Sequence, residues 1–442
     1  MRKKVGLALV FIPMLLILMA TLVVAEGQQE EAGGAMEGVL QVWHPYTQQT
    51  RLDAIEAISN DFSKEYPEIS VEIEVVPFPK IPEKWATAVA ADTTPDVFGN
   101  TAWNAIDAYK AGKLVPADTI LKELGGWDAF NGAETIKKAL VYEGKLLALP
   151  LYGNTRVLVY RRDILNDEGL TPPVTWEEYV DTASKLTNAP DRYGFFQMWD
   201  PSDVGATMYH QIFQSSNDGS FFDNNGNPIL TSKENIETIE FMMELYEAGS
   251  PQKEFSFTYR DVFNLFASGK APMVLNSGFM MNAFENNMPE LAEKRALAIG
   301  EPPYKVQPAG NATYTPISLI KGDMEEAGKE YIKYLFDEKN YTRWVHALPG
   351  AMLPVLKATV ESEEYWDNPQ IQKYEDGIKQ IIDALNNDGL WPGEINENLS
   401  VVTDYGIIEN MYQKIALGRA DVQQAAEEAQ AEMEKRIKER ER

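Results

Sequence analysis

Strand-like and helix-like segments alternate between residues 39 and 98, and this alternation limits the possible folds more than any other feature of the chain. Residues 39–43 form a short β-rich run. Residues 52–62 then carry apolar side chains at spacings of three and four, the period of an amphipathic helix. Residues 71–75 alternate apolar and polar side chains, as a half-buried strand does. A helical Ala-rich stretch at 85–91 and a buried strand from 95 complete a β-α-β-α-β order, which predicts an open α/β sheet.

The later part of the chain also contains both strand-like and helix-like segments. Residues 158–160 and 273–275 have strand-like patterns, and residues 236–246, 263–269 and 327–335 have helical ones, with Gly249 as a C-terminal cap. The last stretch, 421–442, is charged and rich in Ala, Glu, Lys and Arg, which predicts an exposed terminal helix that frays. A length of 442 residues indicates two or three domains, at about 150 residues each.

Charge and cysteine content exclude several functions. The 67 acidic residues outnumber the 40 basic ones, and the formal net charge is −27. Such a surface repels phosphate backbones, so we expect no nucleic acid partner. Cysteine is absent, which rules out disulfides, thiolate zinc sites, cysteine nucleophiles and a lipid-modified N-terminal cysteine.

The N-terminus has the pattern of an export signal. Arg2, Lys3 and Lys4 precede an uncharged stretch at 5–25, which predicts a signal peptide (residues 1–25) cut near Ala25. The alternative is an uncleaved anchor, since 21 apolar residues can also span a bilayer. Residues 26–38 are polar and Gly-rich, as in a flexible lead-in.

Motifs for catalysis, cofactors and metals are missing. The sequence contains no GxGxxG after a strand, no GxxxxGK[ST], no HExxH and no GxSxG. The three histidines are far apart, and residues 223–227, which superficially resemble a calcium loop, lack its last Glu and better suit a hairpin turn. We therefore expect no catalytic residue, no cofactor and no metal site. Nothing singles out a glycosidase carboxylate pair among the 67 acids.

Aromatic and polar residues follow the predicted strand ends. In open α/β sheets, ligands bind outside the carboxyl ends of the strands. Rings stack on the C–H faces of a sugar, and amides and carboxylates bind its hydroxyls. The candidates at such positions are Trp43, His44, Tyr46, Asn100, Trp103, Trp199, Asp200, Asn276 and Phe279. We expect core or rim packing for the other tryptophans considered, which are Trp85, Trp127, Trp176, Trp344 and Trp366.

Seven short motifs in a fixed order resemble one family. The chain from about residue 38 to 436 is similar to the extracellular solute-binding proteins of ABC importers, the large family that includes the maltose-binding protein. The segments that carry the resemblance are 62–71 with its Tyr-Pro, TPDV at 94–97, AGKLVP at 111–116, YEGK and ALP at 142–150, YRRD with PPVTWEE at 160–178, FNLFASGKAPM at 263–273 and GAMLP at 350–354.

The resemblance implies an α/β fold of the class II-like, two-lobe periplasmic binding type. It implies two open sheets joined by a multi-strand hinge, with the ligand cleft between the lobes. We expect crossings near 149–156, 311–316 and 347–354. The N-terminal lobe is then 39–150 plus 311–349, the C-terminal lobe is 151–310 plus 350–430, and 431–442 is a charged helix end.

The resemblance also implies a binding function in which no bond of the ligand is broken. Ligand contacts to both lobes favour the closed state, which docks on a membrane permease driven by an ATPase pair. The protein is then an exported, periplasmic monomer and not an enzyme. Phe279 and Tyr405 fall where the family has ligand-stacking rings, and Asn154 and Arg156 fall on the hinge side of the cleft. The sequence departs from the family pattern in having Arg161 where Asn is usual and Phe279 where Trp is common.

A neutral oligosaccharide is the first expectation for the ligand. Arg156 leaves an anionic ligand open, such as a uronide or a glycerol phosphate, because a guanidinium suits a carboxylate or phosphate. A secreted glycan-active enzyme and a binding protein that reports to a chemoreceptor are the remaining alternatives.

Overall fold

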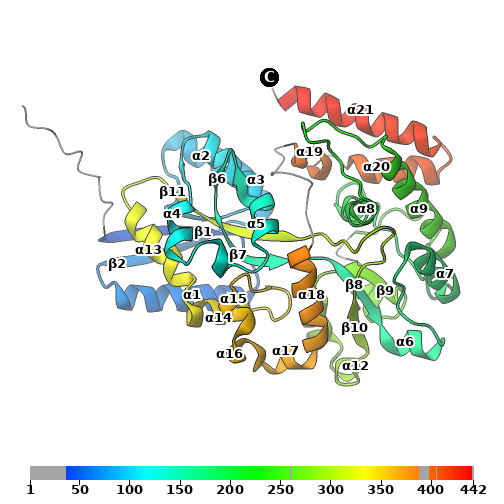
Figure 1. Ribbon diagram of the computed structural model, residues 1–442, viewed down its shortest axis with the longest axis horizontal. Helices are drawn as coiled ribbons and strands as arrows, with labels where there is room; N and C mark the ends of the chain where they lie inside the picture. Colours follow the sequence, from blue (N-terminus) through cyan, green and yellow to red (C-terminus); the bar gives the residue numbers. More distant parts are fainter. Residues whose placement is uncertain (1–35, 259–260, 388–397, 405, 441–442) are drawn as a thin grey trace, which may run out of the picture. The chain divides into compact units, whose positions relative to one another are not determined.

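The computed structural model describes residues 36–258, 261–387, 398–404 and 406–440, and it contains two main β-sheets (Figure 1). The predicted signal peptide at 1–25 and the candidate residue Tyr405 lie outside the described residues. Among the described residues, no helix is both long enough and apolar enough to cross a membrane.

The first sheet has the strand order β2-β1-β3-β11-β4, and β7 also pairs with β11. Strands β1, β2 and β3 are parallel, with Val42 opposite Ile73 on one side and Val97 on the other, and β11 runs antiparallel to β3, β4 and β7. The predicted open α/β sheet is confirmed. The strands are β1 (Gly38–His44), β2 (Ile69–Val75), β3 (Val97–Gly99), β4 (Leu114–Val115), β7 (Leu149–Asn154) and β11 (Thr313–Ile320).

Helices cover both faces of this sheet because successive side chains of a strand point to opposite sides. Val42 and Val97 belong to the core cluster on one face, and Trp43 and Phe98 belong to the cluster on the other. Helices α1 (Gln49–Glu65), α13 (Glu325–Leu335) and α14 (Glu338–Val345) bury apolar residues in the first cluster. Helices α2 (Ile81–Ala91) and α3 (Ala102–Lys110) bury theirs in the second.

The second sheet is smaller and antiparallel, with the order β10-β8-β9. Its strands are β8 (Val157–Arg161), β9 (Met273–Asn276) and β10 (Leu297–Gly300). The helices around it that matter for the site are α7 (Trp176–Leu186), α8 (Gly205–Ser216), α9 (Lys233–Gly249), α10 (Val262–Ala267), α11 (Phe279–Asn287), α18 (Glu375–Asn387), α19 (Leu399–Asp404), α20 (Ile407–Ala416) and α21 (Val422–Arg440).

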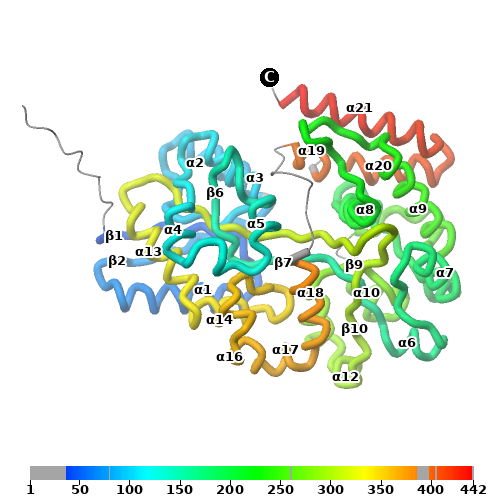
Figure 2. Tube along the Cα trace, in the orientation of Figure 1, coloured from blue at the N-terminus to red at the C-terminus, as the bar shows by residue number. Residues whose placement is uncertain are grey.

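The segment at 149–154 is hydrogen-bonded to two segments far away in sequence, one in β11 and one around Leu353, and Figure 2 shows the chain passing from one sheet region to the other there. Asn154 of β7 lies opposite Thr313 of β11. The backbone N–H groups of Gly153 and Leu353 each donate to the other residue's carbonyl, at 2.9 Å. The crossings expected near 149–156, 311–316 and 347–354 are therefore in contact, while the lobe boundaries drawn from them remain a prediction.

Two local expectations are confirmed and one is corrected. Residues 223–227 form a turn, because Asp223 N–H donates to the Asn227 carbonyl at 2.9 Å. The tryptophans expected to pack are buried or half-buried, at positions 85, 127, 176, 344 and 366. The terminal helix α21 is not simply exposed. Its residues Ala425, Ala426, Ala429 and Met433 are buried, because α20 and α9 pack against that face.

Candidate functional site

Only three Phe, Trp or Tyr side chains among the described residues are exposed, and each follows the end of a strand. They are Phe78, Trp103 and Phe279, at 41%, 38% and 41% exposure. Phe78 and Trp103 follow β2 and β3, whose parallel carboxyl ends share one edge of the first sheet, and Phe279 follows β9 of the second. The structure thus supports accessible rings at Trp103 and Phe279. Phe78 was not among the candidates predicted from the sequence. Its position between two prolines, just after a predicted strand, is the signal that could have identified it.

Trp103 is held by the capped start of helix α3. The Thr101 side chain accepts a hydrogen bond from Asn104 N–H at 3.3 Å, which fixes the first turn. Asn100 is fully buried, and its side-chain amide donates to Ser318 Oγ at 3.1 Å. The expectation of an accessible Asn100 is corrected: the residue ties β3 to β11 and so positions the turn that carries Trp103.

Phe279 is positioned by a turn that folds on itself. Asn276 Oδ1 accepts from Ser277 N–H at 2.7 Å, and Ser277 Oγ accepts from Phe279 N–H at 3.3 Å. Asn276 is only 2% exposed, so its side chain shapes the turn beneath the ring, and the expectation that it is accessible is corrected.

Asn154 and Arg156 lie beside that turn, since Val157 pairs with Asn276 across β8 and β9. Arg156 Nη1 donates to Asn154 Oδ1 at 2.6 Å, and Asn154 Nδ2 donates to the Ala351 carbonyl at 2.8 Å. Both residues are half-buried. The structure therefore brings together Asn154, Arg156 and the strand end that precedes Phe279.

Trp103 also lies close to the last helix of the chain. A small cavity of about 230 Å³ is lined by Trp103, Asp107 and Lys110 of α3 and by Ile437 and Arg440 of α21. Since α21 packs on α20 and α9, elements from both sheet regions meet beside the Trp103 ring.

His44 and Tyr46 are buried, contrary to expectation. The Tyr46 ring packs against Trp344 at 4.9 Å between centroids, and the His44 ring stacks on Tyr46 at 5.0 Å. His44 Nδ1 accepts from Tyr46 N–H at 3.2 Å, and burial lowers the pKa of His44 to about 4. After β1 the chain turns into the core under α14, so neither ring reaches the surface.

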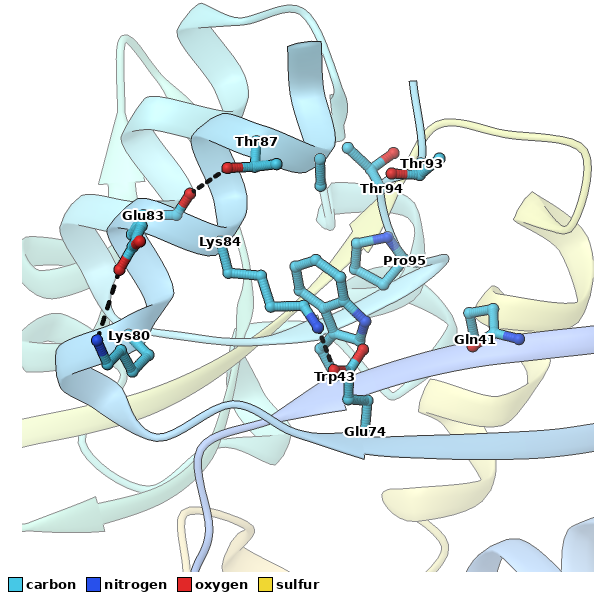
Figure 3. Close-up of a pocket in the computed structure, with 11 residues that line it drawn as sticks. Gln41, Trp43, Glu74, Lys80, Glu83, Lys84, Thr87, Thr93, Thr94 and Pro95 are labelled. Atoms are coloured by element: carbon cyan, nitrogen blue, oxygen red, sulfur yellow. Dashed lines mark hydrogen bonds and ion pairs between the residues drawn. The ribbon is translucent and has the colours of Figure 1, made fainter. Parts of the chain in front are cut away.

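Trp43 points to the opposite face of β1. It is 6% exposed, and its ring meets Phe98 edge-on at 6.2 Å. Lys84 Nζ lies 4.4 Å from the centroid of the indole (Figure 3). Trp43 therefore lies at the end of β1, as predicted, and lines a cavity beneath α2 on the face opposite His44, while its role as a ligand contact remains a prediction.

Trp199 is fully buried between aromatic rings. Its indole stacks on Tyr412 at 5.1 Å and on Phe255 at 5.9 Å, so the expectation of an accessible wall residue is corrected. Asp200 is half-buried and shapes a turn before α8, because Oδ1 accepts from Ser202 N–H and Oγ at 2.8 and 2.6 Å. These bonds lower the pKa of the Asp200 carboxyl.

No group of three or more His, Asp or Glu residues within the described ranges is arranged to hold a metal ion.

Two α/β sheet regions joined by three crossings, with rings and a polar junction at their strand ends, define a two-lobe binding protein. A family model for the bacterial extracellular solute-binding proteins matches residues 46–342, and the chain belongs to that family. The fold class expected from the sequence is confirmed by solved structures of this kind.

Known relatives are distant in sequence but similar over most of the chain. YcjN of Escherichia coli (strain K12), whose name describes a periplasmic-binding protein of an ABC transporter, is 23% identical over 90% of this chain and 92% of its own. The arabinooligosaccharide-binding protein of Halalkalibacterium halodurans is 26% identical over 53% of this chain and 52% of its own.

Solved structures share the fold. The cyclic α-maltosyl-1,6-maltose binding protein of Arthrobacter globiformis superposes with a TM-score of 0.74 at 17% identity, over 90% of this chain and 98% of its own. Maltose-bound T. maritima MalE3 gives a TM-score of 0.72 at 19% identity, over 90% of this chain and 99% of its own.

Proposed function

We propose that the protein captures a neutral oligosaccharide between its two lobes and delivers it to the permease of an ABC importer. One observation carries this proposal: the only exposed aromatic rings of the described chain follow strand ends, two in the first sheet region and one in the second. An exposed ring is unfavourable in water, and a ring at a strand end is where a sugar face can cover it.

The names of relatives favour the same ligand class. Arabinooligosaccharide-binding and maltotriose-binding proteins are among the curated relatives, and a maltose-bound protein is among the structural neighbours. Pentose and hexose oligomers both have apolar ring faces and hydroxyl groups. A site with aromatic rings and amide groups can therefore bind either kind of sugar.

Hinge closure follows from the division of the rings between the lobes. A ligand stacked on Phe279 and on Trp103 or Phe78 contacts both lobes only when they are closed, which gives it the differential affinity that closure requires. The hydrogen-bonded crossings are the place where such bending occurs. The closed form then presents a surface to the permease, and no bond of the ligand is broken.

We further propose that the protein acts outside the cytoplasm as a monomer, exported by residues 1–25. The uncharged stretch at 5–25 after three basic residues supports export, and it leaves an uncleaved anchor as the alternative.

An anionic ligand is the second candidate, because Arg156 is half-buried beside the turn that carries Phe279. Arg156 already donates to Asn154, so the neutral ligand is favoured.

A thermal-shift screen followed by calorimetry tests the proposal. The probes are maltotriose, arabinotriose, ribitol, a glucuronide disaccharide and glycerol 3-phosphate, and the variants are wild type and Arg156→Gln. A ligand at a hundred times its Kd stabilises the protein by about 2.7 kcal/mol. We expect a neutral sugar to bind both variants without being consumed. A response confined to the acidic probes and lost in Arg156→Gln supports the anionic ligand. Consumption of the sugar indicates an enzyme, and a folded sample that no probe shifts contradicts the sugar assignment.

A further inference from the structure

A second cavity lies within the first sheet region, and neither Trp103 nor Phe279 lines it. It has a volume of about 780 Å³, is open to solvent and is lined by residues of β1, β2, α2 and the turn at 93–95 (Figure 3). This volume is in the range of sites for small molecules. Because all its walls belong to the first sheet and its own helix, the cavity exists whether or not the lobes are closed.

Trp43 lines the cavity, and Lys84 covers its indole. The ring is locked by its edge-on contact with Phe98, which in turn stacks on Trp85 at 4.9 Å. Figure 3 shows the Lys84 side chain lying across the indole, with its ammonium group toward Glu74. Lys84 and Glu74 form an ion pair, so a strong donor and a strong acceptor stand together above an aromatic face.

The rim adds hydroxyls and a second balanced pair. Thr93 and Thr94 present side-chain hydroxyls from the turn that closes the cavity. Lys80 and Glu83 lie 3.6 Å apart at the opposite side. The lining thus has two cations and two anions, and its net charge is zero. A neutral ligand fits this balance, because an anion or a cation would meet lining charges of its own sign.

We propose that this cavity is an accessory site for a neutral mono- or disaccharide. The sugar lies over the Lys84 side chain, which covers the Trp43 indole. Its hydroxyls donate to the Glu74 carboxylate and accept from the Lys84 ammonium, and the threonine hydroxyls add further hydrogen-bond partners. The site depends on the proposed function only for the class of ligand. Phe78 lies two residues before Lys80 on the same turn, so a longer chain stacked on Phe78 has a route into the cavity.

The test separates the accessory site from the strand-end site, by which we mean the proposed sugar site at Trp103 and Phe279. Maltose and arabinobiose are the probes, and binding is measured by saturation-transfer NMR and by calorimetry on the full chain. In a Trp103→Ala, Phe279→Ala double variant, we expect weak binding of at least one probe to remain. Adding Lys84→Met, which keeps an apolar stem over the indole, or Thr87→Trp, which fills the cavity from α2, is expected to weaken that remaining binding at least tenfold.

Matched controls exclude general effects. Lys113→Met removes another lysine of the same lobe whose ion pair, with Asp92 at 2.6 Å, lies outside the cavity. Ala86→Trp adds an indole at an exposed position of α2 that does not line the cavity. Both controls are expected to leave binding by the double variant unchanged.

Each outcome decides one question. If the double variant binds neither probe, or binds them equally well with Thr87→Trp, the accessory site is overturned, while tight binding by wild type leaves the proposed function standing. If wild type shows only the weak binding that Thr87→Trp removes, the accessory site stands and the strand-end site fails. If Lys84→Met lowers the melting temperature, the binding measured with Thr87→Trp still shows whether the accessory site exists.

Discussion

The side-chain amide of Asn154 donates to the backbone carbonyl of Ala351 at 2.8 Å, which joins two chain crossings that are 197 residues apart in sequence. The other end of the same amide accepts from Arg156. One side chain therefore links a contact between two crossings to the Arg156 guanidinium.

We expect Asn154→Ala to destabilise the protein by about 1–2 kcal/mol, because the carbonyl of the buried Ala351 loses its donor. Urea unfolding measures the change. Asn287→Ala is the matched control, since Asn287 makes the same kind of bond to Ala283 at 2.7 Å on an exposed helix surface. Equal losses in the two variants would mean that the Asn154 bond has no special role in the hinge.

Phe279→Ala is expected to weaken sugar binding roughly tenfold to a hundredfold while leaving the melting temperature unchanged. The ring is 41% exposed, so little core packing is lost, whereas a stacked sugar loses on the order of 1–3 kcal/mol. Calorimetry checks the affinity. Val306→Ala is the control, because this side chain is 56% exposed and lies in the middle of the loop between β10 and β11 rather than at a strand end. An affinity that is unchanged in Phe279→Ala rules out the ring as a ligand contact.

Glu409 is expected to make stability fall as the pH rises from about 4.5 to about 7. Burial raises the pKa of its carboxyl from 4.5 to about 7, although Thr207 N–H and Oγ donate to Oε1 at 2.9 and 3.0 Å. In this window the unfolded chain releases the proton and the folded chain keeps it, so the folded state loses roughly 3 kcal/mol of relative stability.

Glu409→Gln tests this pH dependence because Gln keeps an acceptor for Thr207 without ionising. Urea midpoints at pH 5, 6, 7 and 8 should fall more steeply for wild type than for the variant. Glu428→Gln, which changes an exposed carboxylate, should follow wild type. Parallel curves for wild type and Glu409→Gln would show that the group is ionised throughout.

Gly278→Ala is expected to destabilise the protein by about 3 kcal/mol or more, because an added Cβ would lie 1.8 Å from the carbonyl oxygen of Gly350. The two backbones cannot approach as closely with any side chain between them. Gly300→Ala should change stability little, since the nearest atom to its added Cβ is Tyr160 Cε1 at 3.7 Å. Thermal unfolding compares the two, and a stable Gly278→Ala variant would show that this crossing can shift.

Much of the fold could be predicted from the sequence because periodicity is a local property. The spacing of Ile55, Ile58 and Phe62 predicted α1, and the alternation at 71–75 predicted β2. Ordered motifs predicted where the crossings lie, and Gly153, Thr313 and Leu353 meet there. The position of Phe279 at a strand end was also predictable from the short run at 273–275.

Accessibility was not predictable, since it depends on residues distant in the chain. Trp43, His44 and Tyr46 are neighbours at the end of one predicted strand, yet the first lines a cavity under α2 and the other two are buried. Tyr46 is covered by Trp344, and Trp199 by Tyr412, about 300 and 200 positions later. By itself, the sequence determined the elements, their order and the family, through short-range patterns. Only the tertiary structure decided that Phe78, Trp103 and Phe279 remain exposed, because burial is set by packing partners that local patterns do not specify.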